Sequence, residues 1–113
     1  MQRGDIYLAS FPFGDMAVMK LRPVLLLTER VGTGTEVVVA YITSVLPAFL
    51  LDSDLRIDPS QPEYQSTRLK TVSVLRLHKL ATIHVTSLQR RLGSISATTQ
   101  QIVNTKLRGV LKV

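Results

Sequence analysis

Short apolar runs bounded by turn residues fill the first half of the chain. Pro23–Thr28 and Glu36–Thr43 are continuous apolar runs of strand length, and a Gly-Thr-Gly turn at Gly32–Gly34 lies between them. Two such runs joined by a glycine-rich turn predict an antiparallel hairpin. Because the hydrophobicity is continuous rather than alternating, both faces of these strands are expected to be covered, as in a barrel or in a sheet packed under helices.

Further strands and two loops are expected around this hairpin. Strand-length segments are found at Gly4–Ser10, Leu55–Ile57 and Val72–Leu77. The segment Phe11–Leu21 loses the strand pattern after Pro12 and predicts a loop. Asp58–Lys70 is polar, holds two prolines and predicts a long or mobile loop.

The C-terminal part of the chain predicts two helices. Thr86 and Gln89 have the spacing of a capping box, which predicts a short helix near Ser87–Arg91 that ends at Gly93. Ser96 is expected to cap a longer helix. The apolar positions of that helix predict one buried stripe, made of Ile102, Val103, Leu107, Val110 and Leu111. Residues 1–113 are therefore expected to form one mainly β domain with a C-terminal helix.

Composition excludes several classes of protein. The chain has no cysteine, so disulfides, cysteine-based zinc sites and a cysteine nucleophile are excluded. Its two histidines cannot build a histidine-rich metal site alone. No apolar run approaches the ~20 residues that span a bilayer, and the polar start has no long apolar segment of a signal peptide. A cytoplasmic protein with no membrane partner is expected.

The charges are divided unevenly along the chain. Residues 1–63 hold eight acidic and five basic side chains, a net charge of −3. Residues 64–113 hold nine basic side chains and no acidic one. Such asymmetry predicts an anionic partner, which the charge alone leaves open among nucleic acid, an acidic peptide and a membrane surface.

A few polar residues lie at strand ends, where they are candidates for phosphate chemistry. Arg22 precedes an apolar strand, and a guanidinium there is either solvated or holds a phosphate in a bidentate contact. The hydroxyls of Thr43 and Ser44 either cap the following turn or donate to a phosphate oxygen. Arg76 and His78 share one face if their strand continues. Phe11 and Phe13 either pack in the core or stack on bases.

Six segments, taken in order, resemble the MazF/PemK (Kid) toxins of type II toxin–antitoxin systems. They are Gly4–Tyr7, Phe11–Gly14, Arg22–Leu25, Ala40–Ser44, Ser73–Arg76 and Arg91–Ser96. The resemblance covers nearly the whole chain. It implies an SH3-like β-barrel with helices, a homodimer, and a cognate acidic antitoxin whose partly disordered tail crosses the active-site cleft.

The resemblance also implies an activity that needs no cofactor and no metal. The implied enzyme is a sequence-selective endoribonuclease that cleaves single-stranded RNA, often mRNA. The 2′-OH of the RNA attacks the adjacent phosphate and leaves a 2′,3′-cyclic phosphate and a free 5′-OH. Such a reaction needs orientation, proton transfer and stabilisation of charge on the phosphorane oxygens.

The resemblance assigns roles to individual residues. Arg22 and Arg76 are expected to stabilise the phosphate, and Thr43 to donate a hydrogen bond to it. A proton-transfer role is also implied for Arg22, although arginine side chains have a pKa of about 12.5–13.8. The expected RNA-binding surface consists of Ser44, Phe11, Phe13, Lys20, Lys79 and Ser73.

One residue departs from the family pattern. His78 lies where the PemK-like branch carries an aspartate, two residues after Arg76. Imidazole titrates near neutral pH, so His78 is a candidate base or acid. The alternative interpretations of this departure are a change of substrate and a catalytically inactive RNA-binding barrel. A separate alternative for the whole chain is a non-enzymatic inhibitor of DNA gyrase like the CcdB toxins, which share the barrel fold.

Overall fold

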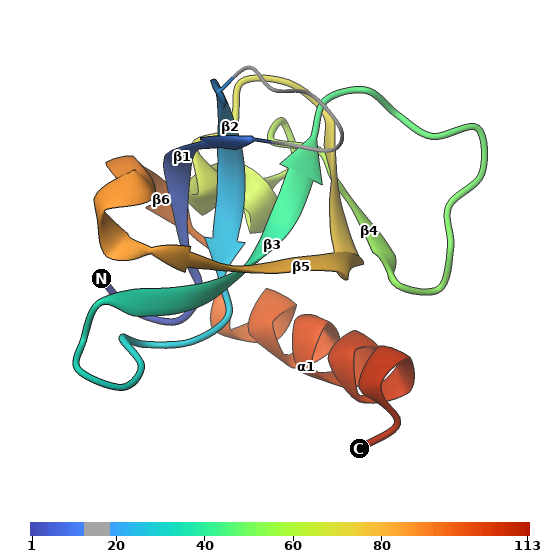
Figure 1. Ribbon diagram of the computed structural model, residues 1–113. Helices are drawn as coiled ribbons and strands as arrows, with labels where there is room; N and C mark the ends of the chain where they lie inside the picture. The colour runs from blue at the N-terminus through green and yellow to red at the C-terminus, as the bar shows by residue number, and fades with distance from the viewer. Residues whose placement is uncertain (13–18) are drawn as a thin grey trace.

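The computed structural model describes residues 1–12 and 19–113 of the chain, and the side chains of residues 1–10 and 20–113. The described residues form one curved antiparallel sheet with a C-terminal helix (Figure 1). In chain order the elements are β1 (Asp5–Pro12), β2 (Met19–Leu26), β3 (Glu36–Thr43), β4 (Asp54–Ile57), η1 (Pro62–Thr67), β5 (Ser73–His84), η2 (Val85–Ser87), β6 (Leu88–Ser94) and α1 (Ala97–Leu111). The mainly β fold with a C-terminal helix is thus confirmed.

The six described strands are hydrogen-bonded in the order β4-β5-β3-β2-β1-β6. Strands β4 and β6 therefore lie at the two edges of the sheet, and no pairing between them is present in the described residues. The closed SH3-like barrel that the resemblance implies is not seen in the hydrogen bonding of these strands.

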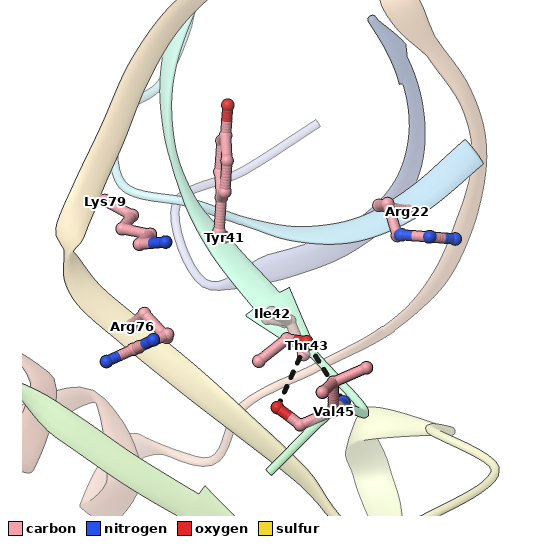
Figure 2. Close-up of a pocket in the computed structure, with 7 residues that line it drawn as sticks. All are labelled: Arg22, Tyr41, Ile42, Thr43, Val45, Arg76 and Lys79. Atoms are coloured by element: carbon pink, nitrogen blue, oxygen red, sulfur yellow. Dashed lines mark hydrogen bonds between the residues drawn. The ribbon is translucent and has the colours of Figure 1, made fainter. Parts of the chain in front are cut away.

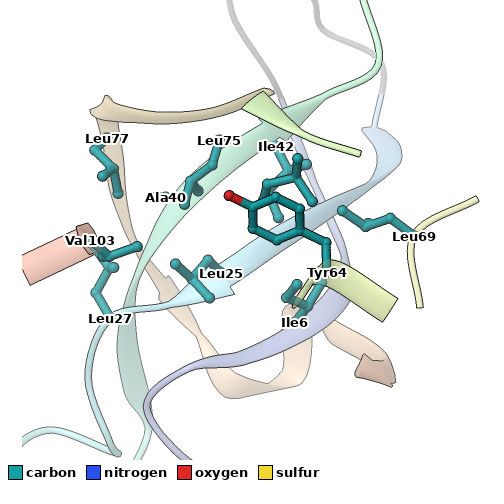
Figure 3. Packing of buried hydrophobic residues seen from close by; sticks show 11 residues of the cluster. Ile6, Leu25, Leu27, Ala40, Ile42, Tyr64, Leu69, Leu75, Leu77 and Val103 are labelled. Carbon is teal, nitrogen blue, oxygen red and sulfur yellow. The ribbon is translucent and has the colours of Figure 1, made fainter. Parts of the chain in front are cut away.

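The predicted hairpin is confirmed as β2 and β3, in which Leu25 pairs with Ala40. The turn between them uses Gly32 and Gly34 at positive φ (+66° and +88°), a conformation that favours glycine. Both faces of the hairpin are covered, as its continuous hydrophobicity predicts. One face packs under α1 and η1 (Figure 3), in a cluster of Ile6, Leu25, Leu27, Ala40, Ile42, Ile57, Tyr64, Leu69, Leu75, Leu77 and Val103. The other face forms a second cluster of Ala9, Val24, Leu26, Val37, Val39 and Ile83.

Two loop predictions need correction. The predicted loop Phe11–Leu21 is too long, because β1 and β2 continue to a pairing of Pro12 with Met19. Backbone pairing needs no regular side-chain pattern, so Pro12 and the irregular sequence after it concealed these strand ends. The predicted loop Asp58–Lys70 contains η1, and Tyr64 of that helix is buried in the core cluster. This segment is a packed cover of the sheet rather than a free loop.

The short helix predicted near Ser87–Arg91 is wrong, because this segment is η2 followed by β6. The N–H of Thr86 donates to Nδ1 of His84 at 3.1 Å, which satisfies locally the group that a helix cap would have bound. Pairing with β1 then extends the backbone. A Cβ on Gly93 would lie 2.3 Å from the carbonyl oxygen of Ser66, so the glycine allows η1 to approach β6.

The predicted cap of the long helix is confirmed, since Ser96 Oγ accepts the N–H of Thr99 at 3.1 Å. The predicted apolar stripe is buried only in part. Val103 is fully buried, whereas Ile102 and Leu111 are 37% and 52% exposed. None of the helices in the described ranges is long and apolar enough to cross a bilayer.

Candidate functional site

A cavity of about 350 Å³ opens on the sheet surface beside β2, β5 and the end of β3 (Figure 2). Its lining comprises Arg22, Tyr41, Ile42, Thr43, Val45, Arg76 and Lys79. Three of the four predicted catalytic residues, Arg22, Thr43 and Arg76, therefore meet at one cavity although the first and the last are 54 positions apart in the sequence. The fourth, His78, lies beside the cavity and not in its lining.

Arg22 lies in the middle of β2, opposite Ala9 of β1. Its side chain is exposed, and among the described residues Nη1 makes a long contact of 3.4 Å with the carbonyl oxygen of Leu21. In Figure 2 the guanidinium lies across the cavity from Arg76 and Lys79. An exposed guanidinium at a cavity with further cations is suited to an anionic ligand.

Thr43 is the last residue of β3, and its hydroxyl caps the turn that follows. Oγ1 accepts the N–H of Val45 at 3.1 Å and lies 3.4 Å from the carbonyl oxygen of the same residue. Since 3.4 Å is long for an O–H···O bond, the hydroxyl proton is only weakly held there. A rotation of the hydroxyl would let Thr43 donate into the cavity while it keeps the bond from Val45.

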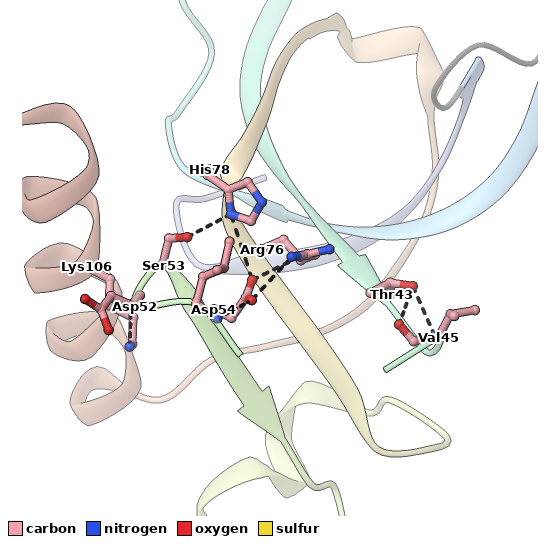
Figure 4. Close-up of polar contacts among 9 residues, drawn as sticks. Thr43, Val45, Asp52, Ser53, Asp54, Arg76, His78 and Lys106 are labelled. Atoms are coloured by element: carbon pink, nitrogen blue, oxygen red, sulfur yellow. Dashed lines mark hydrogen bonds and ion pairs between the residues drawn. The ribbon is translucent and has the colours of Figure 1, made fainter. Parts of the chain in front are cut away.

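Arg76 is held by a buried carboxylate, that of Asp54 on β4 (Figure 4). Nε donates to Oδ1 at 3.0 Å and Nη2 approaches Oδ2 at 3.4 Å. Burial alone would raise the pKa of Asp54, but the N–H of Leu51, the guanidinium of Arg76 and the nearby His78 together lower it. Asp54 is therefore a carboxylate at neutral pH and pairs with the permanent charge of Arg76.

His78 lies next to the same carboxylate. Its Nδ1 is 2.8 Å from Oγ of Ser53 and 3.9 Å from Oδ1 of Asp54. The other ring nitrogen, Nε2, points away from these two partners in Figure 4. An imidazole that is held at one nitrogen, directs the other away from these partners and is 29% exposed has the arrangement of a general acid or base.

An irregularity in β5 brings these side chains together. The register against β3 passes from Ala40 opposite Leu80 to Tyr41 opposite Arg76, so that residues 77–79 bulge out of the ladder. The N–H of Leu77 in this bulge donates to the carbonyl oxygen of Ser53 at 3.0 Å. A bulge changes the direction of the side chains beside it, and here both Arg76 and Lys79 reach the cavity.

A second, more apolar cavity of about 270 Å³ adjoins the first, and both are lined by Arg22 and Ile42. Two predicted RNA-binding residues, Ser44 and Ser73, line the second cavity rather than the first. Its remaining lining residues are Leu8, Leu21, Pro23, Arg68, Leu69, Lys70, Thr71, Arg90 and Leu92. Apolar side chains are thus accompanied by four cations, a composition suited to a base and its phosphates.

Three predicted RNA-binding residues are not placed at either cavity. Lys20 is half-buried on β2 and is not part of either lining. The backbone of Phe11 pairs with Lys20, but its side chain lies outside the described part, and Phe13 lies outside the described residues altogether. In the described ranges, no group of three or more His, Cys, Asp or Glu side chains is placed to hold a metal ion.

Several site residues were missed by the reasoning from sequence. Asp54 and Ser53 have no local motif, and only the register of β4 against β5, where Asp54 pairs with Arg76, identifies them. The basic residues of the second cavity were visible as part of the charge excess but not individually. They are Arg68, Lys70 and Arg90.

Solved structures of other proteins share this fold. The toxin MazF-mt6 of Mycobacterium tuberculosis is similar over 96% of this chain and 97% of its own, with a TM-score of 0.74 and 25% identity. A mycobacterial endoribonuclease solved in complex with its cognate antitoxin is similar over 100% and 96%, with a TM-score of 0.73 and 20% identity. MazF of Deinococcus radiodurans is similar over 99% and 96%, with a TM-score of 0.70 and 16% identity.

No curated protein sequence matches the chain significantly. The family model of the PemK-like, MazF-like toxins matches residues 2–111, which is nearly the whole chain. The family assignment therefore rests on this sequence match, and the fold is shared with solved toxins. The chain belongs to the PemK-like, MazF-like toxins of type II toxin–antitoxin systems.

Proposed function

We propose that this toxin is a metal-independent, sequence-selective endoribonuclease that cleaves single-stranded RNA, including mRNA. The observation that supports the proposal is the convergence of Arg22, Thr43 and Arg76 on one cavity from three different strands. Two cations and a hydroxyl donor around one cavity suit a phosphate that gains negative charge during a reaction. Solved relatives described as endoribonucleases share the fold.

The proposed reaction uses the 2′-OH of the RNA as nucleophile. Its oxygen attacks the adjacent phosphorus, the P–O5′ bond breaks, and the products carry a 2′,3′-cyclic phosphate and a 5′-OH. Arg22 and Arg76 stabilise the phosphorane oxygens, and Thr43 donates a hydrogen bond to one of them. His78 exchanges protons through Nε2, accepting one from the 2′-OH or giving one to the leaving 5′ oxygen. The positions of the oxygens can thus be held without a metal ion.

The second cavity is proposed to bind the nucleotide next to the cleaved bond. Its cations, among them Arg68, Lys70 and Arg90, would contact phosphates, and its apolar residues would contact a base. Because both cavities are lined by Arg22, one strand of RNA can pass from one to the other. Ser44, Ser73 and Lys79 are expected along this path.

Two protein partners follow from the family. We propose a homodimer and an acidic antitoxin whose tail covers the same cationic cavities and blocks RNA. A relative from a mycobacterial species is solved with its cognate antitoxin, and MazF of Deinococcus radiodurans is solved with MazE. An acidic tail would be attracted to this toxin, because residues 64–113 hold nine basic side chains and no acidic one.

The test is cleavage of single-stranded RNA by the purified toxin in EDTA. The product ends decide the chemistry, because a 5′-OH accepts a label from a kinase without earlier phosphatase treatment. Thr43→Ala should lower kcat by about 10²–10³, as for a lost oxyanion donor, and Thr43→Ser should retain most of the activity. Intact RNA under all conditions, with inhibition in a parallel gyrase supercoiling assay, would support the alternative of a gyrase inhibitor.

A further inference from the structure

The turn before β4 carries a carboxylate that the proposed mechanism does not use directly. The side chain of Asp54 is 0% exposed, yet it lies beside the cavity rather than in its lining. A buried carboxylate is costly unless it is paired and hydrogen-bonded. Its position therefore needs an explanation in terms of its partners.

The contact with Arg76 fixes both the direction and the plane of the guanidinium. Oδ1 accepts Nε at 3.0 Å while Oδ2 faces Nη2 at 3.4 Å, so two edges of planar groups meet. The carboxylate itself is held by the N–H of Leu51, which donates to Oδ2 at 2.9 Å. Asp54 engages only Nε and Nη2, so the remaining N–H donors of the guanidinium are left for another ligand.

The same turn also holds the bulge of β5. Ser53 accepts the N–H of Leu77 through its carbonyl oxygen, and its hydroxyl meets Nδ1 of His78 at 2.8 Å. A bulged segment is less constrained by its own ladder, because its residues lack partners on β3. The contacts that Ser53 makes from the turn before β4 therefore fix the direction of the side chains in the bulge.

We propose that Asp54 is a positioning residue, whose buried carboxylate orients the guanidinium of Arg76 toward the phosphate of bound RNA. The inference rests on the proposed ribonuclease activity. A long, flexible arginine side chain that is ordered before substrate arrives loses less entropy on binding and needs no reorganisation during the reaction. Asp54 acts through Arg76 and does not itself touch the substrate.

The decisive variant is Asp54→Asn. Its amide oxygen can still accept the N–H of Leu51, but its NH₂ group then faces Nε of Arg76. We expect kcat on a single-stranded RNA substrate to fall about 10²-fold, the effect of a small misplacement of a reacting group, with a much smaller change in KM. Asp54→Ser, which also keeps an acceptor for Leu51, should lose activity in the same way.

Two measurements separate positioning from a general loss of structure. In an Arg76→Ala background, Asp54→Asn should cause no further loss of kcat, since it acts through the missing guanidinium. In ¹⁵N NMR spectra, the Nε–H signal of Arg76, assigned by its absence in Arg76→Lys, should be sharp in the wild type. It should shift and broaden in Asp54→Asn while the backbone spectrum stays folded.

The matched control is Asp5→Asn, because Asp5 closes the same kind of turn and pairs with Arg91. An equal loss of kcat in the two aspartate variants, or an unchanged Arg76 Nε–H signal in Asp54→Asn, would overturn the proposal. If the wild type cleaves no RNA, the proposed function fails. The NMR signal of Arg76 still decides whether Asp54 positions this side chain.

Discussion

Two aspartates of this toxin close the same turn in two different places. Asp5 opens β1 and Asp54 opens β4, and the N–H of each donates to the carbonyl oxygen three residues earlier, at 3.0 and 2.9 Å. The N–H of that earlier residue, Gln2 or Leu51, donates back to the carboxylate at 2.9 Å in both turns. The same pair of hydrogen bonds, made by an aspartate, thus begins both strands.

The two turns differ in the arginine that each carboxylate meets. Arg91 reaches Asp5 through Nη2 alone, at 3.2 Å, and its side chain is 51% exposed. Arg76 meets Asp54 through Nε and Nη2, and its side chain is 19% exposed. Arg76 lines the first cavity, whereas Arg91 lines neither of the two cavities described above.

The difference shows how a structural turn acquires a role at a site. In the Asp5–Arg91 pair the aspartate is also buried, but the arginine side chain is half exposed and is held through one nitrogen, so its geometry is freer to vary. A buried, two-point pair restrains both partners. The aspartate turn by itself is therefore a structural feature found at both strands. The turn of Asp54 is a candidate for function because its arginine partner, Arg76, lines a cavity.

The largest expected effect is on activity. Arg76→Ala should lower kcat on single-stranded RNA by about 10²–10³, because a charge that stabilises the phosphorane is removed. Arg91→Ala should cleave at nearly the wild-type rate. Both rates are measured with the same RNA at saturating concentration, after circular dichroism has shown that each variant is folded. A comparable loss in the two variants would remove the distinction between the turns.

The second effect is on acid stability. The pKa of Asp54 is lowered in the folded protein, so its carboxylate stabilises the fold at pH values above the unfolded pKa of about 3.9. This contribution is lost as the pH falls through the lower pKa of the folded state. Asp54→Asn should therefore unfold at lower urea than the wild type at pH 7.

The gap between the two urea midpoints should narrow as the pH falls below about 4. Urea titrations at pH 7, 5 and 3, followed by circular dichroism, measure that gap. A gap of constant size across this range would show that Asp54 contributes through packing and not through its charge.

Much of the fold was predictable because local patterns determine it. The β2–β3 hairpin follows from two apolar runs and a glycine turn, and Ser96 marks the start of α1. The error at Ser87–Arg91 has a physical cause. A capping-box spacing is a weak local signal, and pairing of β6 with β1, which links residues far apart in sequence, overrides it.

The site was predictable only where a resemblance marked single residues. Arg22, Thr43 and Arg76 were named in advance and line one cavity, although their roles stay predictions. Asp54 was not named, because its importance depends on the register of a four-residue edge strand. No pattern in the sequence predicts that register. The contact of Asp54 with an arginine on the neighbouring strand can therefore be recognised only in the folded structure.

The smallest expected effect concerns His78, which is contacted by Ser53 of the turn that contains Asp54. Ser53→Ala removes the hydroxyl that lies 2.8 Å from Nδ1 of His78, a hydrogen bond worth about 0.5–1.5 kcal/mol. If His78 transfers protons through Nε2, kcat should fall by roughly 2–10-fold with KM unchanged. The matched control is Ser66→Ala, which removes a hydroxyl that donates to the carbonyl oxygen of Ser94 at 2.8 Å. Ser66 lines neither of the two cavities, so this variant should not alter kcat. Because Ser53→Ala leaves Asp54 and Arg76 paired, an unchanged kcat would confine the role of this turn to Arg76, and a fall would extend it to His78.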